Sequence, residues 1–88
     1  MSAAAKPVVS PLTGTVLSCA GVGETVPAGR ALVVIESMKM EHVVEAPENV
    51  EVVRMWVAVG DTVREGQMLV EVVAAHAATS TEQAAAKT

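Results

Sequence analysis

One lysine stands out as the residue that could carry chemistry in this chain. Lys39 lies in "ESMKM", between two methionines and between two segments, "RALVVIE" and "EHVVEA", that are typical of antiparallel strands. A tight connection between two strands normally contains Asn-Gly, Asp-Gly or another glycine, because its central residues need positive φ. None is present here. Since local sequence rules fail most often at functional or strained positions, we predict a functional hairpin tip rather than a chance surface lysine.

Lys39 is a poor nucleophile by itself. Lysine amines are protonated in neutral water, so a separate enzyme would have to remove the proton before the amine could react. No other residue in the chain could do so. The two histidines, His42 and His76, have no nucleophile near them in the sequence, and the single cysteine, Cys19, matches no metal or redox spacing. We expect His42 to be a strand residue, Cys19 to be structural and the chain to contain no catalytic constellation.

The composition favours β-structure. Of the 88 residues 51% are hydrophobic, yet there is no Phe or Tyr and only one Trp, so the core must consist of Val, Leu, Ile and Met. Valine is stiff at χ1 and suits a pleated surface. Turn signals such as "SPLTG", "PAG", "VGD" and "REGQ" separate short apolar segments, which predicts an all-β sandwich or flattened barrel without a helix between Pro11 and Val72. The side chains expected inside are Val16, Val26, Leu32, Val34, Val52, Val63, Leu69 and Val72.

The middle of the chain is an internal repeat. The matched residues are Pro11 with Pro47, Val16 with Val52, Gly23 with Gly60, Gly29 with Gly66 and Leu32 with Leu69. The separation changes from 36 to 37 within "VVRMWVAVG", so one residue has been gained in the second half. Neither half is large enough to bury its own apolar face, so the two must pack on each other. A pseudo-two-fold relation between them places the connecting "SMKMEH" at one end of the domain.

The ends of the chain differ from its middle. We expect residues 1–7 to be a tail, residues 8–74 to be the folded domain and the Ala-rich residues 75–88 to be a disordered tail, so that Lys6 and Lys87 lie in tails. The net charge is −4 with no basic run, which argues against nucleic acid. There is no signal-peptide pattern and no apolar stretch as long as a membrane span. We therefore expect a cytoplasmic protein that does not bind a membrane.

The tip and its flanks resemble a known family. "ESMKM" is similar to the Glu-Ala-Met-Lys-Met signature of biotinyl domains, the carboxyl carriers of biotin-dependent carboxylases, and the likeness runs from "SPLTGTV" to "VGDTVREGQMLVEV". The resemblance implies a flattened β-sandwich, or barrel-sandwich hybrid, of two four-stranded antiparallel sheets. It also implies that Lys39 carries biotin, joined to it by an amide bond. Residues expected to be read by a ligase or another partner are Glu36, Met38, Met40 and Glu41.

The resemblance implies a non-catalytic carrier rather than an enzyme. Its expected partners are a biotin protein ligase, a biotin carboxylase that carboxylates the biotin ring, and a carboxyltransferase that passes the carboxyl group to an acyl-CoA, pyruvate or similar acceptor. Isolated, the domain is expected to be monomeric. Two alternatives stay open: a lipoyl domain, which shares the fold but usually has Asp-Lys-Ala at the tip, and an unmodified β-sandwich that mediates protein contacts.

Two departures from the biotinyl pattern concern local geometry. The family usually has glycine where this chain has Val50, the counterpart of Gly14, and we expect Asn49 to take over the positive-φ position, since Asn tolerates it better than a β-branched residue. The first half is also one residue shorter than usual around "VLSCAGVG", so the strand there is expected to differ in register or bulge. That stretch is too short for the "thumb" that some bacterial acetyl-CoA carboxylase carriers insert.

Overall fold

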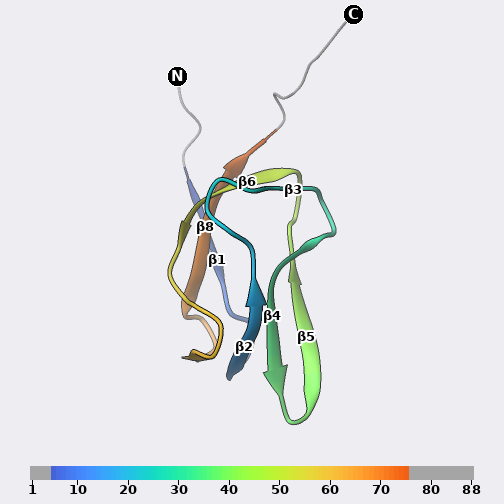
Figure 1. Cartoon of the computed structure of the whole chain (residues 1–88), viewed down its shortest axis with the longest axis vertical. Coiled ribbons are helices and arrows are strands. Elements are labelled where there is room, and N and C mark those ends of the chain that lie inside the picture. The colour runs from blue at the N-terminus through green and yellow to red at the C-terminus, as the bar shows by residue number, and fades with distance from the viewer. Residues whose placement is uncertain (1–4, 76–88) are drawn as a thin grey trace, which may run out of the picture.

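Residues 5–75 form eight strands in two four-stranded antiparallel sheets, as described by a computed structural model (Figure 1). The strands are β1 (Lys6–Val9), β2 (Gly14–Cys19), β3 (Thr25–Val26), β4 (Ala31–Ser37), β5 (Met40–Glu45), β6 (Val50–Met55), β7 (Thr62–Val63) and β8 (Met68–Ala74). One sheet has the order β1-β8-β6-β3 and the other β5-β4-β2-β7. No helix occurs in this range. The predicted all-β fold of two four-stranded sheets is confirmed.

The core lies between the two sheets and consists almost entirely of valine, leucine and isoleucine. Its buried side chains are Val16, Val26, Leu32, Val33, Ile35, Ala46, Val50, Val52, Val57, Val63, Leu69, Val70 and Val72. Seven of the eight side chains predicted to be inside are among them. The exception is Val34, which is only half-buried, so that prediction was wrong.

A bulge in β4 explains the error at Val34. The register between β4 and β5 shifts between Ala31 and Val33, so Leu32 is an extra residue on its strand. Such a bulge interrupts the alternation of side chains between the two faces. Leu32 and Val33 are consequently both buried, and Ile35 rather than Val34 points inward. The repeat already contained this information, because the residue 37 positions after Val34 is Glu71, a poor candidate for the core.

The hydrogen bonds show the predicted pseudo-two-fold symmetry. The Val16 amide donates to the Asp61 carbonyl at 2.8 Å, so β2 of the first half is hydrogen-bonded to the residue before β7 of the second half. At the equivalent place the Val52 amide donates to the Glu24 carbonyl at 2.9 Å. Each half therefore completes backbone hydrogen bonds of the other, as expected for two halves that pack on each other.

Equivalent hydrogen bonds also locate the residue gained in the second half. The Ala20 and Trp56 amides, 36 positions apart, donate to equivalent leucine carbonyls, whereas the Gly21 and Ala58 amides, 37 apart, donate to equivalent acidic side chains. The additional residue is therefore Val57, which is buried in the core. The strands themselves match, since β2 and β6 have the same register shift. Within this chain the difference in length therefore lies in the loop that follows each strand, and the expected departure of the first half from the family in register or bulge stays a prediction.

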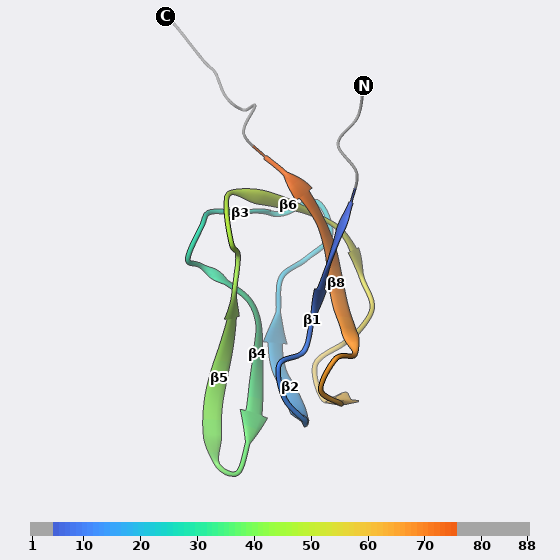
Figure 2. The same cartoon turned by 180° about the vertical axis from the view of Figure 1, so that it is seen from behind.

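The hairpin and the outer ends of the first and last strands lie at opposite ends of the molecule. Figure 1 shows the β4–β5 connection at the bottom, while β1 begins and β8 ends at the top; Figure 2 shows the same arrangement from behind. Strand β1 begins at Lys6 and pairs it with Val72, so the prediction that Lys6 lies in an N-terminal tail was wrong. Most of the C-terminal tail predicted for residues 75–88, including His76 and Lys87, lies outside the described residues.

Candidate cofactor-attachment site

Strands β4 and β5 form a hairpin whose turn consists of two residues. Ser37 pairs with Met40, which leaves Met38 and Lys39 as the turn. Their φ values are 53° and 65°, the positive values that both central residues of a type I′ turn require. They are the only non-glycine residues with positive φ in the range 5–75. The backbone thus adopts the favoured hairpin turn with residue types that disfavour it, at a cost of about 1–2 kcal/mol per residue.

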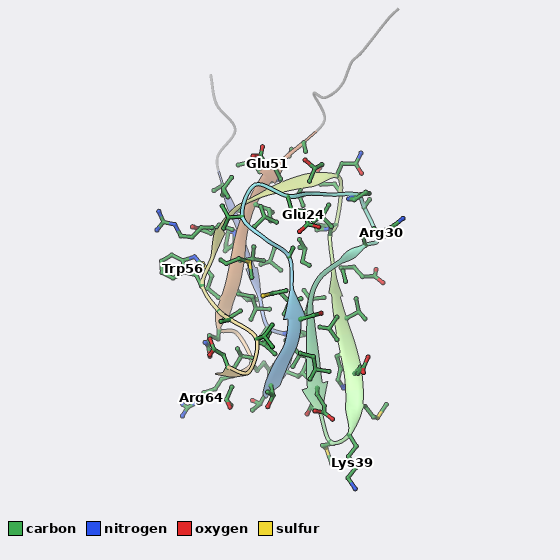
Figure 3. All side chains as sticks on the ribbon, in the orientation of Figure 1. Glu24, Arg30, Lys39, Glu51, Trp56 and Arg64 are labelled. Atoms are coloured by element: carbon green, nitrogen blue, oxygen red, sulfur yellow. The ribbon has the colours of Figure 1, made fainter. Side chains whose placement is uncertain are left out.

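The turn projects the lysine away from the body of the domain. Figure 3 shows Lys39 at the extreme tip, with its amine directed outward. Met38 is 92% exposed and Met40 is 62% exposed, so neither thioether is packed against the core. No carboxylate of the described part of the chain forms a salt bridge with Lys39. The Lys39 side chain is therefore exposed to solvent and forms no salt bridge among residues 5–75.

Two glutamates face each other directly behind the turn. Glu36 of β4 pairs with Glu41 of β5, and both are exposed. Their side chains lie on the outer face of the sheet, because the neighbouring Ile35 points into the core. Like charges at directly opposed positions destabilise an antiparallel pair. The hairpin thus contains all five predicted site residues within its last two residue pairs and its turn: two carboxylates, two thioethers and one amine.

A glycine of the adjacent strand determines how closely β2 approaches the base of the hairpin. A Cβ at Gly14 would collide with the backbone carbonyl of Glu36 and would lie 2.6 Å from Cγ2 of Ile35. The backbone at Gly14 has no positive φ, so close approach, not turn conformation, requires glycine there. Sequence reasoning missed this role, because no local pattern shows that a carbonyl from another strand lies over the position.

The counterpart of Gly14 does not need to be glycine. Val50 is buried in the core, and Asn49 does not have positive φ, so the expectation for Asn49 was wrong. Instead the Asn49 side-chain oxygen accepts a hydrogen bond from the Ala28 amide at 2.9 Å. Thr13 does the same in the other half, where its hydroxyl accepts from the Glu65 amide at 3.4 Å.

The rest of the described chain offers no second chemical site. His42 of β5 is half-buried and pairs with Ile35 of β4. Within residues 5–75 no three His, Cys, Asp or Glu side chains are close enough to hold a metal ion, and no pocket is present. No helix there is long and apolar enough to cross a membrane. What the hairpin can do is present one amine for acylation and carry the acyl group that results.

The family assignment agrees with this geometry. Residues 6–72 match the family described as "Biotin-requiring enzyme". The chain belongs to this family. The match begins with the first residue of β1 and ends within β8, so it covers both sheets and the hairpin. The predicted resemblance to biotinyl domains is confirmed.

Relatives within the biotin-requiring family include carboxylase components. The chain is 43% identical over 60 residues to the biotin carboxyl carrier protein of acetyl-CoA carboxylase from Solanum lycopersicum, covering 67% of this chain and 86% of that one. It is 41% identical over 51 residues to pyruvate carboxylase from Staphylococcus aureus, covering 58% of this chain and only 4% of the relative. A solved single-chain, multi-domain long-chain acyl-CoA carboxylase contains a domain that superposes with a TM-score of 0.78 at 36% identity, covering 86% of this chain and 8% of that one.

Proposed function

We propose that Lys39 carries biotin, joined through an amide between its Nζ and the valerate carboxyl of the cofactor. The domain then moves a carboxyl group between a biotin carboxylase and a carboxyltransferase. The observation that supports this most strongly is the two-residue turn, in which Lys39 takes a strained positive φ at the extreme tip of a hairpin. Similarity to a carrier protein of acetyl-CoA carboxylase supports biotin as the group attached.

Attachment changes the charge and reach of the tip. A ligase removes one proton from the Lys39 ammonium and supplies activated biotin. The neutral amine then attacks the acyl carbon, the bond between that carbon and the leaving group breaks, and the nitrogen loses a second proton. The formal net charge of the chain then falls from −4 to −5, because one ammonium is lost. The product is a long, uncharged arm on a hairpin whose base is fixed by the core. Carboxyl transfer is the chemistry of the cofactor and of partner active sites, and this chain positions the cofactor.

The residues around Lys39 are proposed to be read by the ligase and by later partners. The Glu36–Glu41 pair places two carboxylates side by side on the outer face, where they suit basic groups on a partner surface. Met38 and Met40 present flexible, polarizable side chains on either side of the lysine, and such side chains adapt to different partner surfaces.

We further propose how the domain works together with its partners. The chain spans most of the tomato carrier protein but only small parts of the longer carboxylases, and those relatives act on different acceptors, so the acceptor is chosen by a carboxyltransferase. Tethering to partners would raise the effective concentration of the biotin arm at each active site. We propose that the isolated domain is monomeric and that it works in the cytoplasm.

The identity of the attached group is the direct test. The chain and its Lys39→Arg variant are co-expressed with a biotin ligase and, separately, with a lipoate ligase, and their intact masses are measured. Biotin on the wild type and no addition to Lys39→Arg is the expected result. Arginine keeps the charge and exposure, so the variant should unfold at the same denaturant concentration as the wild type. Lipoate on Lys39, or biotin on Lys39→Arg, would contradict the proposal.

A further inference from the structure

The two methionines beside Lys39 differ from the other described methionines in exposure. Met38 and Met40 are 92% and 62% exposed, whereas Met55 and Met68 are half-buried. Met38 also occupies a turn position with positive φ, which methionine disfavours. An exposed side chain gains little from folding, so the stability of the domain does not explain why thioethers stand at the tip.

The property that distinguishes methionine from leucine at an exposed position is the chemistry of its sulfur. Susceptibility to oxidation follows exposure, and the sulfoxide product is polar and chiral where the thioether was apolar. We propose that Met38 and Met40 form a redox-sensitive pair: peroxide-class oxidants convert them to sulfoxides and thereby slow the attachment of biotin at Lys39. This inference rests on the proposed function of Lys39.

The oxidation step balances with hydrogen peroxide as the oxidant. The thioether sulfur attacks one peroxide oxygen, and a new sulfur–oxygen bond forms as the oxygen–oxygen bond breaks. The hydrogen of the transferred oxygen passes as a proton to the departing oxygen, which leaves as water. The sulfur is oxidised by two electrons and the peroxide is reduced by two. The net change on the protein is one added oxygen for each methionine, with no change in charge.

The consequence should fall on recognition and leave the fold intact. Because both side chains project into solvent, their sulfoxides remain hydrated and the core between the sheets is untouched. A ligase that encloses the tip must instead strip water from each new sulfoxide oxygen, a strong hydrogen-bond acceptor. Burying a polar group without a partner lowers binding enough to slow labelling by about fivefold or more.

The experiment uses the unbiotinylated 88-residue chain in a Cys19→Ser background, because the half-buried thiol of Cys19 is also oxidisable. The protein is treated with hydrogen peroxide, the peroxide is removed with catalase, and oxidation is assigned by peptide mass. Initial rates of biotin attachment by a purified ligase follow. The matched control is Met38→Leu/Met40→Leu, and a second arm treats oxidised protein with methionine sulfoxide reductases before labelling.

The expected result is faster oxidation at Met38 and Met40 than at Met55 and Met68, slower labelling after oxidation, and recovery after reduction. The leucine variant should be labelled at the same rate before and after peroxide; if it is a poor substrate, the reductase arm alone decides.

Oxidation of Met55 or Met68 as fast as Met38 would overturn the selectivity. Unchanged labelling of fully oxidised tips would overturn the effect on recognition. Failure of untreated protein to take biotin on Lys39 would overturn the proposed function as well, and is distinguishable because it precedes oxidation.

Discussion

The β4–β5 hairpin and the β8–β1 pair are two versions of the same structure. Val33 pairs with Val44 in the first, and their counterparts Val70 and Val8 pair in the second. Each ladder has a register shift at its inner end, which places two consecutive side chains in the core. One ladder joins neighbouring segments of the chain, and the other joins the first strand to the last.

The difference between the two ladders lies at their outer ends. In the β1–β8 ladder the last pair is Lys6 with Val72. The β4–β5 ladder passes the equivalent pair, Ile35 with His42, and continues through two further pairs to the turn. Those added residues lie beyond the core and are mostly exposed. Residues that stabilise the fold are therefore shared by both halves, whereas residues proposed to serve function occur in one half only.

The largest expected effect tests whether the two halves share one core. Leu32 and Leu69 are equivalent and fully buried, so Leu32→Ala and Leu69→Ala should each lower the free energy of unfolding by about 2–5 kcal/mol. Denaturant unfolding of both variants measures this. Losses that differ by more than the spread between replicate measurements would break the equivalence of the halves.

The next effect distinguishes the base of the hairpin from its counterpart. Gly14→Ala should destabilise by about 1–3 kcal/mol, because the new methyl group must push the Glu36 carbonyl and Ile35 away. Gly21→Ala is the matched control, since the nearest atom to its Cβ is 3.9 Å away and its φ is not positive. Equal unfolding midpoints for Gly14→Ala and Gly21→Ala would show that β2 can move without cost.

A smaller effect should appear equally in both halves. Gly23 and Gly60 have φ values of 90° and 96°, and a Cβ added at either position would meet open space. Gly23→Val and Gly60→Val therefore suffer from backbone conformation, since the new Cβ meets no neighbour. Each should lose more than about 1 kcal/mol of stability. Thermal or denaturant midpoints that match the wild type in either variant would contradict this explanation.

The smallest expected effect is a gain in stability. It comes from a change at the hairpin tip that should also abolish biotin attachment. Met38→Asn with Lys39→Gly installs the residues that a type I′ turn prefers, and should raise the free energy of unfolding by about 1 kcal/mol. The same double variant should take no biotin. Denaturant midpoints and a streptavidin blot measure the two properties, and a loss of stability would mean that the present turn is not strained.

Much of this fold could be predicted from the sequence because the same strand and turn signals occur in both halves of the repeat. The valine-rich segments indicated strands, and equivalent glycines indicated equivalent turns. Val34 was misplaced because a bulge adds one residue without any local mark in the sequence. Glu71, at the equivalent position of the other half, was the available signal.

The candidate site was predicted more fully than its surroundings. Lys39 and its two methionine neighbours were identified because they break the rules of turn composition, and the structure shows positive φ at Met38 and Lys39. Glu36 and Glu41 were included only because the resemblance to biotinyl domains implied them. The role of Gly14 could not be predicted, because it depends on a carbonyl of another strand. The pairing of Glu36 with Glu41 depends on the length of the turn. The register of β4 against β5 shows that this turn has two residues.

Lys6 provides the most direct test of the claim that the hairpin tip, and not exposure alone, makes Lys39 the acceptor. Lys6 is exposed, lies in the equivalent ladder at the opposite end, and contacts Glu48 at 3.8 Å. The measurement is the biotin occupancy of each lysine peptide after limited treatment with a purified ligase and ATP. We expect biotin on Lys39 alone, with none on Lys6 even when Lys39→Arg removes the competitor. Biotin on Lys6 at a comparable rate would contradict the claim.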